Sequence, residues 1–419
     1  MPSDPLPNDR LLTEPLTGSI DLPGWATAGH VIAVFDAFAA AGAEARFVGG
    51  CVRDAVLGQE PSDIDLATAV EPEGVIKLLE AAGLKAIPTG IEHGTITALA
   101  QKEQGGGTVE ITTLRRDVST DGRHAEVAFS QSWREDAARR DFTINALNAT
   151  RDGVLEDWTN GQADLKAGRV RFIGEASQRI AEDHLRILRF FRFHGRFAAG
   201  APDVAAMEAC IGQAALIEHL SGERIREELF RILGQASGAS LIALMAGTGI
   251  LKHALPVELS AECLAAADGH DAFPVTDAVL CLGISLPGDE GVRDQVADHL
   301  KLSNADRRRL TIMLRDMPDN LELAMHRLGV QAVTDRAWLD FATGRSPSSD
   351  LDGVLAAAST WQPVELPVNG QDLQALGLAP GPKLGEVLKA LEMWWFDAGR
   401  APGREATLVQ AKHLIGQID

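Results

Sequence analysis

Cysteine and aromatic residues are scarce in this chain of 419 residues, and tyrosine is absent. The four cysteines are far apart, and no two of them have Cys-x-x-Cys spacing; they are Cys51, Cys210, Cys263 and Cys281. This spacing argues against a zinc site or a disulfide framework and favours reduced thiols in a cytoplasmic protein.

Long hydrophobic runs are also missing. No segment approaches about 18 uninterrupted apolar residues, so we expect no membrane-spanning helix. Residues Met1–Arg10 are rich in proline and aspartate and lack a basic start, so we expect no secretory signal. The hydrophobic fraction of 45% is nevertheless sufficient for buried cores, and the length predicts about two to four domains.

Positive charge is scarce as well. The formal net charge is −20, which is unusual for a protein that binds nucleic acid. The location of charge matters more than its sum, however. Arginines gather in one stretch of the chain, where Arg151 is followed by Arg169, Arg171, Arg179, Arg186, Arg189, Arg192 and Arg196. We therefore predict a local basic face, compatible with RNA binding, on an acidic protein.

The first chemistry-bearing feature is a glycine turn followed by paired aspartates. An apolar segment ends in Gly49 and Gly50, and ten residues after Arg53 come Asp63 and Asp65. Residues at i and i+2 of a β-strand point to the same face, so we expect the two carboxylates side by side. Such oxygen ligands suit two Mg²⁺ ions that hold a nucleoside triphosphate. The glycines let backbone N–H groups approach phosphates, and the arginine adds a fixed cation.

A third carboxylate is expected nearby. Segments 94–100 and 108–113 predict two strands of a hairpin, joined by the glycines at 105–107. Glu110 lies between two β-branched residues of the second strand, so we expect it beside the paired aspartates. The simpler alternatives are a bare glycine turn, a solvated strand end and a solvent-facing glutamate.

The remaining pattern divides the chain in two. Helices are predicted over 25–45 and 72–82, whereas 115–134 is charged and aperiodic and is interpreted as a mobile loop. From Glu135 onward, Ala/Leu periodicity predicts an almost entirely helical chain. We therefore expect an α/β head followed by a long helical remainder.

A charged segment at 135–146 precedes an apolar stretch. The guanidinium of Arg140 suits triphosphate oxygens because it binds them in a bidentate manner. Asp141 can accept a hydrogen bond from a ribose hydroxyl. The alternative is that Asp141 only caps a helix and the arginines are exposed.

A second charged segment, 182–192, predicts one amphipathic helix with Asp183 and Arg186 at i and i+3. Cytosine and adenine both present an amino donor beside a ring nitrogen acceptor, whereas uracil and guanine present the reverse. A carboxylate next to a guanidinium therefore matches C or A and leaves U or G mismatched. An ordinary salt-bridged helix is the alternative.

Four motifs, in this order and spacing, are similar to those of class II CCA-adding enzymes and bacterial poly(A) polymerases, the template-independent nucleotidyltransferases of the polymerase-β superfamily. The motifs are Phe47–Asp54, Asp63–Asp65, Arg139–Ala146 and Glu182–Arg186. Weaker similarity continues at Ser221–Leu229 and Asn369–Leu373. Segment Thr89–Thr97 resembles CCA-adding members more than poly(A) polymerases, whose corresponding stretch is more basic.

The resemblance implies an α+β fold, with a polymerase-β-like nucleotidyltransferase head (a mixed β-sheet with helices) followed by an all-α neck, body and tail. We place an N-terminal extension at 1–24, the head at 25–157, the neck at 158–235, the body at 236–355 and the tRNA-binding tail at 356–419. The sequence leaves the oligomeric state open.

The implied activity is Mg²⁺-dependent addition of C, C and A from CTP and ATP to the 3′ end of tRNA, with contacts to its acceptor and T arms. Asp63 and Asp65 would bind the metal ions, and Glu110 would assist attack by the 3′ hydroxyl. The nucleotide would be held at its triphosphate by Gly49, Gly50 and Arg53, at phosphate and ribose by Arg140 and Asp141, and at the base by Asp183 and Arg186, with support from Arg189 and Arg192.

Other functions remain open at this point. Within the family, the alternatives are a poly(A) polymerase or an enzyme that adds only CC or only A; the loop 117–129 is present but lacks the tyrosine common near it. A noncatalytic RNA-binding paralogue would have no reason to keep carboxylates that repel one another without metal. The adjacent His270 and Asp271 could indicate a metal-dependent phosphohydrolase site. The simpler interpretation is that they are two neighbouring residues of a loop without a metal.

Overall fold

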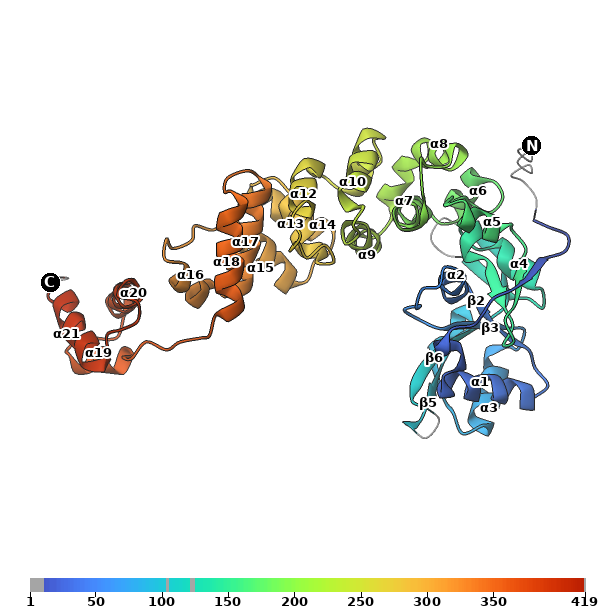
Figure 1. The fold of residues 1–419 in the computed structure, drawn as a ribbon, viewed down its shortest axis with the longest axis horizontal. Coiled ribbons are helices and arrows are strands. Elements are labelled where there is room, and N and C mark those ends of the chain that lie inside the picture. The colour runs from blue at the N-terminus through green and yellow to red at the C-terminus, as the bar shows by residue number, and fades with distance from the viewer. Residues whose placement is uncertain (1–10, 103–104, 121–124, 418–419) are drawn as a thin grey trace. The chain divides into compact units, whose positions relative to one another are not determined.

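The computed structural model describes residues 11–102, 105–120 and 125–417, and these divide into two compact units (Figure 1). Unit 1 comprises the chain up to Ser237 together with Leu244–Ala254, and unit 2 comprises Gly238–Ala243 and the chain from Leu255 onward. The stretch Met1–Arg10, where we expect no secretory signal, lies outside the described residues, as do four residues of the expected mobile loop.

Unit 1 is built on an eight-stranded sheet in the order β1-β10-β9-β2-β3-β6-β5-β4. All neighbouring strands are antiparallel except β3 and β6, which are parallel, so the sheet is mixed as expected. The strands are β1 (Leu16–Ser19), β2 (Ala45–Val48), β3 (Asp65–Thr68), β4 (Lys85–Gly90), β5 (Thr95–Ala100), β6 (Gly107–Thr113), β9 (Leu147–Ala149) and β10 (Val154–Asp157).

Two helices cover the part of this sheet that contains β4, β5 and β6: α1 (Gly29–Ala40) and α3 (Pro72–Ala81) (Figure 1). Phe47 of β2 is fully buried, and the rings of Trp25 and Phe35 pack edge-on against it. This core fixes the end of β2, where the glycine turn begins. The predicted helix at 72–82 and the predicted hairpin of β5 and β6 are confirmed.

Several expectations about unit 1 were wrong. The helix predicted over 25–45 ends at Ala40, because Gly42 adopts a positive φ of 67° and the chain then enters β2. All four residues of β2 are buried, including Arg46, and so short a segment has too few positions to show a strand period. The same reason applies to β9, whose three residues are buried and include Asn148; β9 and β10 both lie in the region expected to be helical.

The segment 115–134, interpreted as a loop, contains a two-stranded hairpin of β7 (Arg115–Thr120) and β8 (Ala125–Phe129), followed by α4 (Trp133–Ala138). A ribbon held together by backbone pairing does not require an apolar face, so its sequence shows no alternation. Residues Leu16–Ser19, within the expected N-terminal extension, form an edge strand of the main sheet.

The segment expected as one helix at 182–192 is interrupted. Helix α6 ends at Glu182 and helix α7 begins at Arg186, so Asp183 lies in the turn between them. The helices of unit 1 after the sheet are α5 (Gly161–Lys166), α6 (Ala176–Glu182), α7 (Arg186–Phe197), α8 (Val204–Gly212), α9 (Gly222–Leu233) and α11 (Leu251–Ala254).

Unit 2 is helical throughout the residues that the structure describes, which confirms the helical remainder. Its helices are α12 (Ala261–Asp268), α13 (Ala278–Ser285), α14 (Glu290–His299), α15 (Asn304–Ile312), α16 (Leu321–Leu328), α17 (Val330–Ala342), α18 (Ser348–Thr360), α19 (Gly370–Ala375), α20 (Pro382–Asp397) and α21 (Arg404–Ile415), and α10 (Gly238–Gly247) contributes residues to both units. Among the described helices, none is both long and apolar enough to cross a bilayer.

His270 of unit 2 is part of a packed aromatic cluster. Its ring packs edge-on against Trp338 and Phe341, and its Nε2 lies 3.2 Å from Asp352. Within the described ranges, no three or more His, Cys, Asp or Glu side chains are grouped as a metal site. These contacts favour the structural interpretation of His270.

Candidate active site

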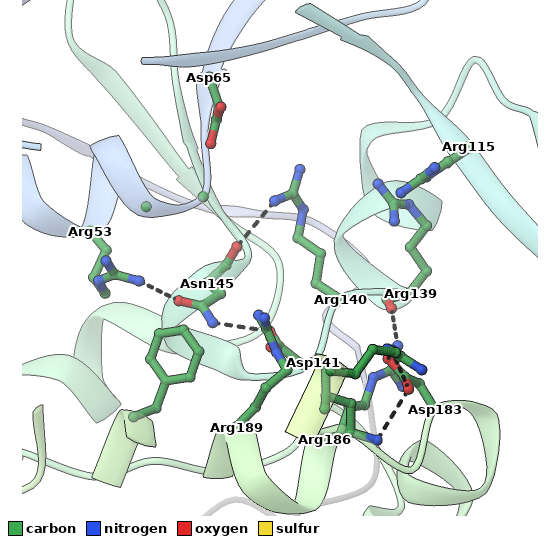
Figure 2. A pocket seen from close by; sticks show the side chains of 15 residues that line it. Arg53, Asp65, Arg115, Arg139, Arg140, Asp141, Asn145, Asp183, Arg186 and Arg189 are labelled. Carbon is green, nitrogen blue, oxygen red and sulfur yellow. Dashed lines mark hydrogen bonds and ion pairs between the residues drawn. The ribbon is translucent and has the colours of Figure 1, made fainter. Parts of the chain in front are cut away.

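A pocket of about 510 Å³ opens in unit 1, where the ends of β2 and β3 meet the turn between α6 and α7 (Figure 2). Its lining is strongly basic in an otherwise acidic chain, with seven arginines against three aspartates. The lining residues are Gly49, Gly50, Arg53, Asp65, Arg115, Arg139, Arg140, Asp141, Asn145, Asp183, Leu185, Arg186, Arg189, Phe193 and Arg224. Such a charge distribution suits a ligand with several negative charges.

The glycine turn lies at the wall of this pocket. Gly49 follows β2 with a φ of 70°, and α2 (Gly50–Val56) begins directly after it. A Cβ atom at Gly49 would lie 2.9 Å from Nη1 of Arg140, so a side chain here would displace that guanidinium. The turn therefore brings backbone and Arg140 together, as a phosphate site requires.

Asp65 is the first residue of β3 and points into the pocket (Figure 2), and its partner in the parallel register is Glu110 of β6. Asp63 is exposed and lies in the turn before β3, so the expectation that both aspartates belong to one strand was wrong. The strand begins two residues later because only the residues after Asp65 are buried and paired with β2. Glu110 is exposed and, like Asp63, is outside the pocket lining.

Asp63 and Glu110 nevertheless affect the ionisation of Asp65. Burial and the charge of Glu110 raise the pKa of Asp65 to about 6; Asp63 adds to the rise, and Arg140 opposes it. A bound cation would relieve this crowding of negative charge at Asp65. Mg²⁺ commonly takes one or two protein carboxylates and completes its shell with water and substrate phosphates, so Asp63 and Asp65 fit this ion.

Replacing Asp65 by asparagine should stabilise metal-free unit 1 by roughly 1–3 kcal/mol above pH 6. The wild-type carboxyl is destabilising there, because its pKa is about 6 in the folded state against an ordinary value of 3.8. The gain should disappear as the pH falls below about 4, where the carboxyl is protonated in both states. Urea denaturation in the presence of EDTA, followed by peptide-resolved hydrogen exchange, measures the free energy of unfolding of unit 1 separately from unit 2. If wild type and Asp65→Asn were equally stable at pH 8, the Asp65 carboxylate would not be destabilising.

Arg53 is held rigidly beside the turn. It is buried, donates to Asp54 at 2.9 Å and to Oδ1 of Asn145 at 2.6 Å, and lies over the ring of Phe197 at 4.3 Å. Burial lowers the pKa of its guanidinium, although Asp54 opposes this. A cation in this fixed position can bind phosphate with little loss of conformational entropy.

Asp141 lines the pocket and is the centre of a hydrogen-bond network. Its Oδ2 accepts from Arg189 at 2.8 Å, and its Oδ1 accepts from Nδ2 of Asn145 at 3.0 Å and from the backbone N–H of Phe142 (Figure 2). Burial alone would raise the pKa of this carboxyl, but Arg189 and Asn145 hold it well below its usual range. Asp141 is therefore part of an ionised network and does not act as a simple helix cap.

The two arginines before Asp141 are aligned by a buried aspartate. Asp136 of α4 accepts from Arg139 at 2.8 Å and from Arg140 at 3.0 Å. Burial opposes ionisation of Asp136, but both arginines lower its pKa. Nη1 of Arg140 also donates to the carbonyl of Asn145 at 3.4 Å, which directs this side chain towards the turn.

Arg192 lies behind the pocket, outside its lining. It donates to Glu228 of α9 at 2.6 Å, and Glu228 also lies 3.7 Å from Arg189. Glu228 is buried and thus links the two arginines. This arrangement agrees with a supporting role for Arg192, which stays a prediction.

Asp183 and Arg186 both line the pocket, at the side away from Asp65 (Figure 2). They have different partners. Arg186 donates to Glu182 at 2.7 Å and to the carbonyls of Arg179 and Arg139 at 2.9 and 3.0 Å. Asp183 accepts from Nη2 of Arg224, on α9, at 2.9 Å.

The expected basic face is largely a set of ion pairs. Arg169 and Arg171 pair with the buried Asp164, and Arg196 lies near Asp54. Of this arginine stretch, Arg186 and Arg189 line the pocket. The arginines of this stretch are therefore divided between ion pairs and the pocket lining, and an RNA-binding face stays a prediction.

Several lining residues were missed among the predicted site residues: Arg115, Arg139, Asn145, Leu185, Phe193 and Arg224. Asn145 and Arg139 stand inside a motif, and their polarity beside Asp141 is a signal that could have been used. Phe193 has the spacing of a core residue on α7. Arg224 is about forty residues from Asp183 in sequence, but it lies in the segment Ser221–Leu229 of weaker family similarity, which is a signal that could have been used.

Comparisons with known proteins agree with this site. The poly A polymerase head domain matches residues 45–171, and a family described as a probable RNA and SrmB-binding site of polymerase A matches residues 203–261. The mitochondrial CCA tRNA nucleotidyltransferase 1 of Mus musculus is 34% identical over 379 residues, which are 86% of this chain and 85% of that protein. The CCA-adding enzyme of Levilactobacillus brevis is 33% identical over 395 residues, 88% of this chain and 94% of that one.

The fold is similar as well. A crystal structure of the Bacillus stearothermophilus CCA-adding enzyme in complex with CTP superposes with a TM-score of 0.74 at 26% identity, covering 93% of this chain and 98% of that chain. The resemblance read from the motifs is confirmed, together with the polymerase-β-like head and the helical remainder. The chain belongs to the family of CCA-adding tRNA nucleotidyltransferases.

Proposed function

We propose that this protein adds C, C and A to the 3′ end of tRNA from CTP and ATP without a nucleic-acid template. The observation that carries the proposal is one pocket that has Asp65 at one side, a basic wall for phosphates, and Asp183 with Arg186 at the other side. Relatives at 34% and 33% identity carry the names of enzymes with this activity.

The reaction joins the tRNA 3′ oxygen to the α-phosphorus of the nucleotide and breaks the bond between the α- and β-phosphates, so pyrophosphate leaves. Mg²⁺, held by Asp63 and Asp65, would supply Lewis-acid activation of phosphate oxygens. Glu110, on the strand beside Asp65, would orient the attacking 3′ hydroxyl and accept its proton. The loss of a proton from that hydroxyl balances the charge of the departing pyrophosphate.

The arginines would bind and orient the nucleotide. Arg53 and Arg140 lie on either side of the glycine turn and would hold the triphosphate, which fixes the α-phosphorus near Asp65. Asp141, fixed by Arg189, lies between the turn and the base-reading side, where it can accept from a ribose hydroxyl. Arg186 is held by three acceptors, so its remaining N–H groups present a fixed pattern to a base.

Nucleotide incorporation into tRNAs that end at the discriminator base, at C and at CC tests this function directly. With each of the four nucleoside triphosphates in turn, we expect C, then C, then A, and no further addition. Continued addition of A would identify a poly(A) polymerase, and addition that stops at CC or occurs only on CC would identify a partial enzyme. No incorporation into any of the three tRNAs would contradict the proposal.

Replacing Asp183 by alanine should reduce the preference for CTP and ATP over UTP and GTP at least tenfold. The change removes the acceptor for an amino group, and a hydrogen bond to a charged group is worth about 1.5–3 kcal/mol. Catalysis should survive, because Asp65 is at the other side of the pocket. The measurement is kcat/KM for each nucleotide on tRNA ending in C. A proportional loss with all four nucleotides would assign Asp183 a purely structural role.

We also propose a cytoplasmic location, on the basis of the four reduced and separated cysteines. In this proposal the neck, body and tail keep the boundaries expected from the sequence, and the head also includes β1. Unit 2 would then supply most of the contacts to the acceptor and T arms of tRNA. Some relatives are mitochondrial proteins, and fractionation of cells that express the protein distinguishes the two locations.

A further inference from the structure

Arg224 contacts the carboxylate to which the proposed function assigns base reading. Its Nη2 donates to both oxygens of Asp183, at 2.9 Å to Oδ1 and 3.1 Å to Oδ2. Both side chains line the pocket, and about a third of each is exposed. Arg224 comes from α9, so it is not part of the motif that contains Asp183.

Arg186 does not occupy this position. Its guanidinium donates to Glu182 and to two backbone carbonyls, those of Arg179 and Arg139. Arg186 is buried, and its three acceptors come from two separate segments of the chain. The partner that the sequence suggested for Asp183 is thus fixed elsewhere, and Arg224 takes the place beside the carboxylate.

The position of Arg224 on its helix is unusual. It is the third residue of α9, in the first turn, where the helix dipole disfavours a cation. Glu223, next to it, has the charge sign that this turn favours. The ion pair with Asp183 offsets the unfavourable placement of Arg224, which indicates that the contact is the reason for an arginine here.

Asp183 is held from two directions. It directly follows the last residue of α6, and its Oδ1 also accepts from the backbone N–H of Leu185 at 3.1 Å. A carboxylate oxygen has two acceptor directions. Oδ1 is therefore occupied by the turn and by Arg224, whereas Oδ2, with its longer contact to Arg224, retains a direction for an amino group in the pocket.

We propose that Arg224 is a positioning residue for base selection. It holds the Asp183 carboxylate in the orientation that accepts from the exocyclic amino group of cytosine or adenine, and it thereby sets the preference against uracil and guanine. This inference rests on the proposed function of the pocket, and it adds a residue from α9 to the base-reading set.

The test compares three single variants. Arg224→Met removes the donor and keeps the apolar stem, whereas Arg224→Lys keeps one cationic donor, and the contact uses a single nitrogen. Arg231→Met is the control, because Arg231 lies on the same helix, its side chain is 60% exposed and it is outside the pocket lining. For each, kcat and KM are measured for CTP and UTP on tRNA ending in C.

In Arg224→Met, the CTP preference should fall roughly tenfold, mainly through a higher KM for CTP, because one charge-assisted contact orients the acceptor. Arg224→Lys should stay within about threefold of wild type, and Arg231→Met should be unchanged. Equilibrium binding of CTP and UTP to tRNA-free protein should show the same loss of preference. In the Asp183→Ala background, Arg224→Met should have no further effect on preference, since both act through one carboxylate.

Three results would overturn the inference: an unchanged CTP preference in Arg224→Met, tighter CTP binding in that variant, which would make Arg224 a competitor of the base, or a full additional loss in the double variant. If Arg224→Met does not fold, Arg224→Gln, which is polar and neutral, is read in the same assays. If the wild-type protein adds C and A and the Arg224 variants keep the same preference for CTP over UTP, only this inference fails. If the wild-type protein adds no nucleotide at all, the proposed function fails.

Discussion

The Asp65→Asn protein should fold normally and yet add neither C nor A, with the rate of addition lowered at least about 10³-fold. A metal-bound carboxylate supplies several kcal/mol of transition-state stabilisation, and each 1.4 kcal/mol is about tenfold in rate. Of the paired aspartates, Asp65 is the one that lines the pocket, and burial together with the neighbouring carboxylates raises its pKa to about 6. Asparagine keeps the shape of the side chain and removes the charge.

Single-turnover incorporation of C and of A, measured beside tRNA binding, checks this result. tRNA affinity should change little, because Asp65 belongs to unit 1, whereas the proposed contacts to the tRNA arms are assigned mostly to unit 2. Asp36→Asn is the matched control: this aspartate is exposed on α1 and pairs with Arg151 at the surface, so its activity should stay within about twofold. Near-normal turnover by Asp65→Asn would exclude a metal role for this residue. Combined with the gain in stability expected above, inactivity would show that the carboxylate is kept for function at a cost in stability.

Replacing Asp141 by alanine should destabilise unit 1 by about 3–5 kcal/mol, the cost of breaking a buried ion pair and leaving one partner unpaired. Asp141 is buried, and its loss leaves Arg189 and the Asn145 amide without their acceptor. Because its pKa is held well below the ordinary value of 3.8, its contribution is present above about pH 4 and is lost as the pH falls further. Urea denaturation followed by peptide-resolved hydrogen exchange measures the change in unit 1, with unit 2 peptides as an internal reference.

Two further variants make this measurement decisive. Asp36→Ala breaks an exposed ion pair in the same unit and should cost less than about 1 kcal/mol. The double variant Asp141→Ala/Arg189→Met should recover part of the loss, because it removes the unpaired charge as well. A loss of less than about 1 kcal/mol in Asp141→Ala, or strict additivity in the double variant, would mean that the network does not stabilise the pocket.

The sequence by itself determined the chemistry of this protein to a large extent. The glycine turn, the paired aspartates and the Arg-Arg-Asp segment were sufficient to predict a nucleotide site, because turns and short motifs are encoded by neighbouring residues. Gly49 does adopt the positive φ that its place in the motif suggests. The helical remainder was predictable for the same reason, since helix periodicity is local.

The short buried strands could not be predicted from the sequence pattern. β2 has four residues and β9 has three, and all of them are buried, including Arg46 and Asn148, so neither strand is long enough to show its period in the sequence. The parallel pairing of β3 with β6, which places Glu110 beside Asp65, joins segments about forty-five residues apart. Asp63 was placed on a strand by its spacing, but the strand begins only at Asp65, where pairing and burial begin.

Tertiary structure alone decided how the arginines are used. The sequence grouped them in one stretch, but buried partners such as Asp164 and Glu228 neutralise several, while others enter the pocket. It also decided that Asp183 lies in a turn against Arg224, with Arg186 bound to other acceptors. Local patterns carry the conformational preferences of a few neighbouring residues, whereas the pairing of charges depends on which distant segments the fold brings together.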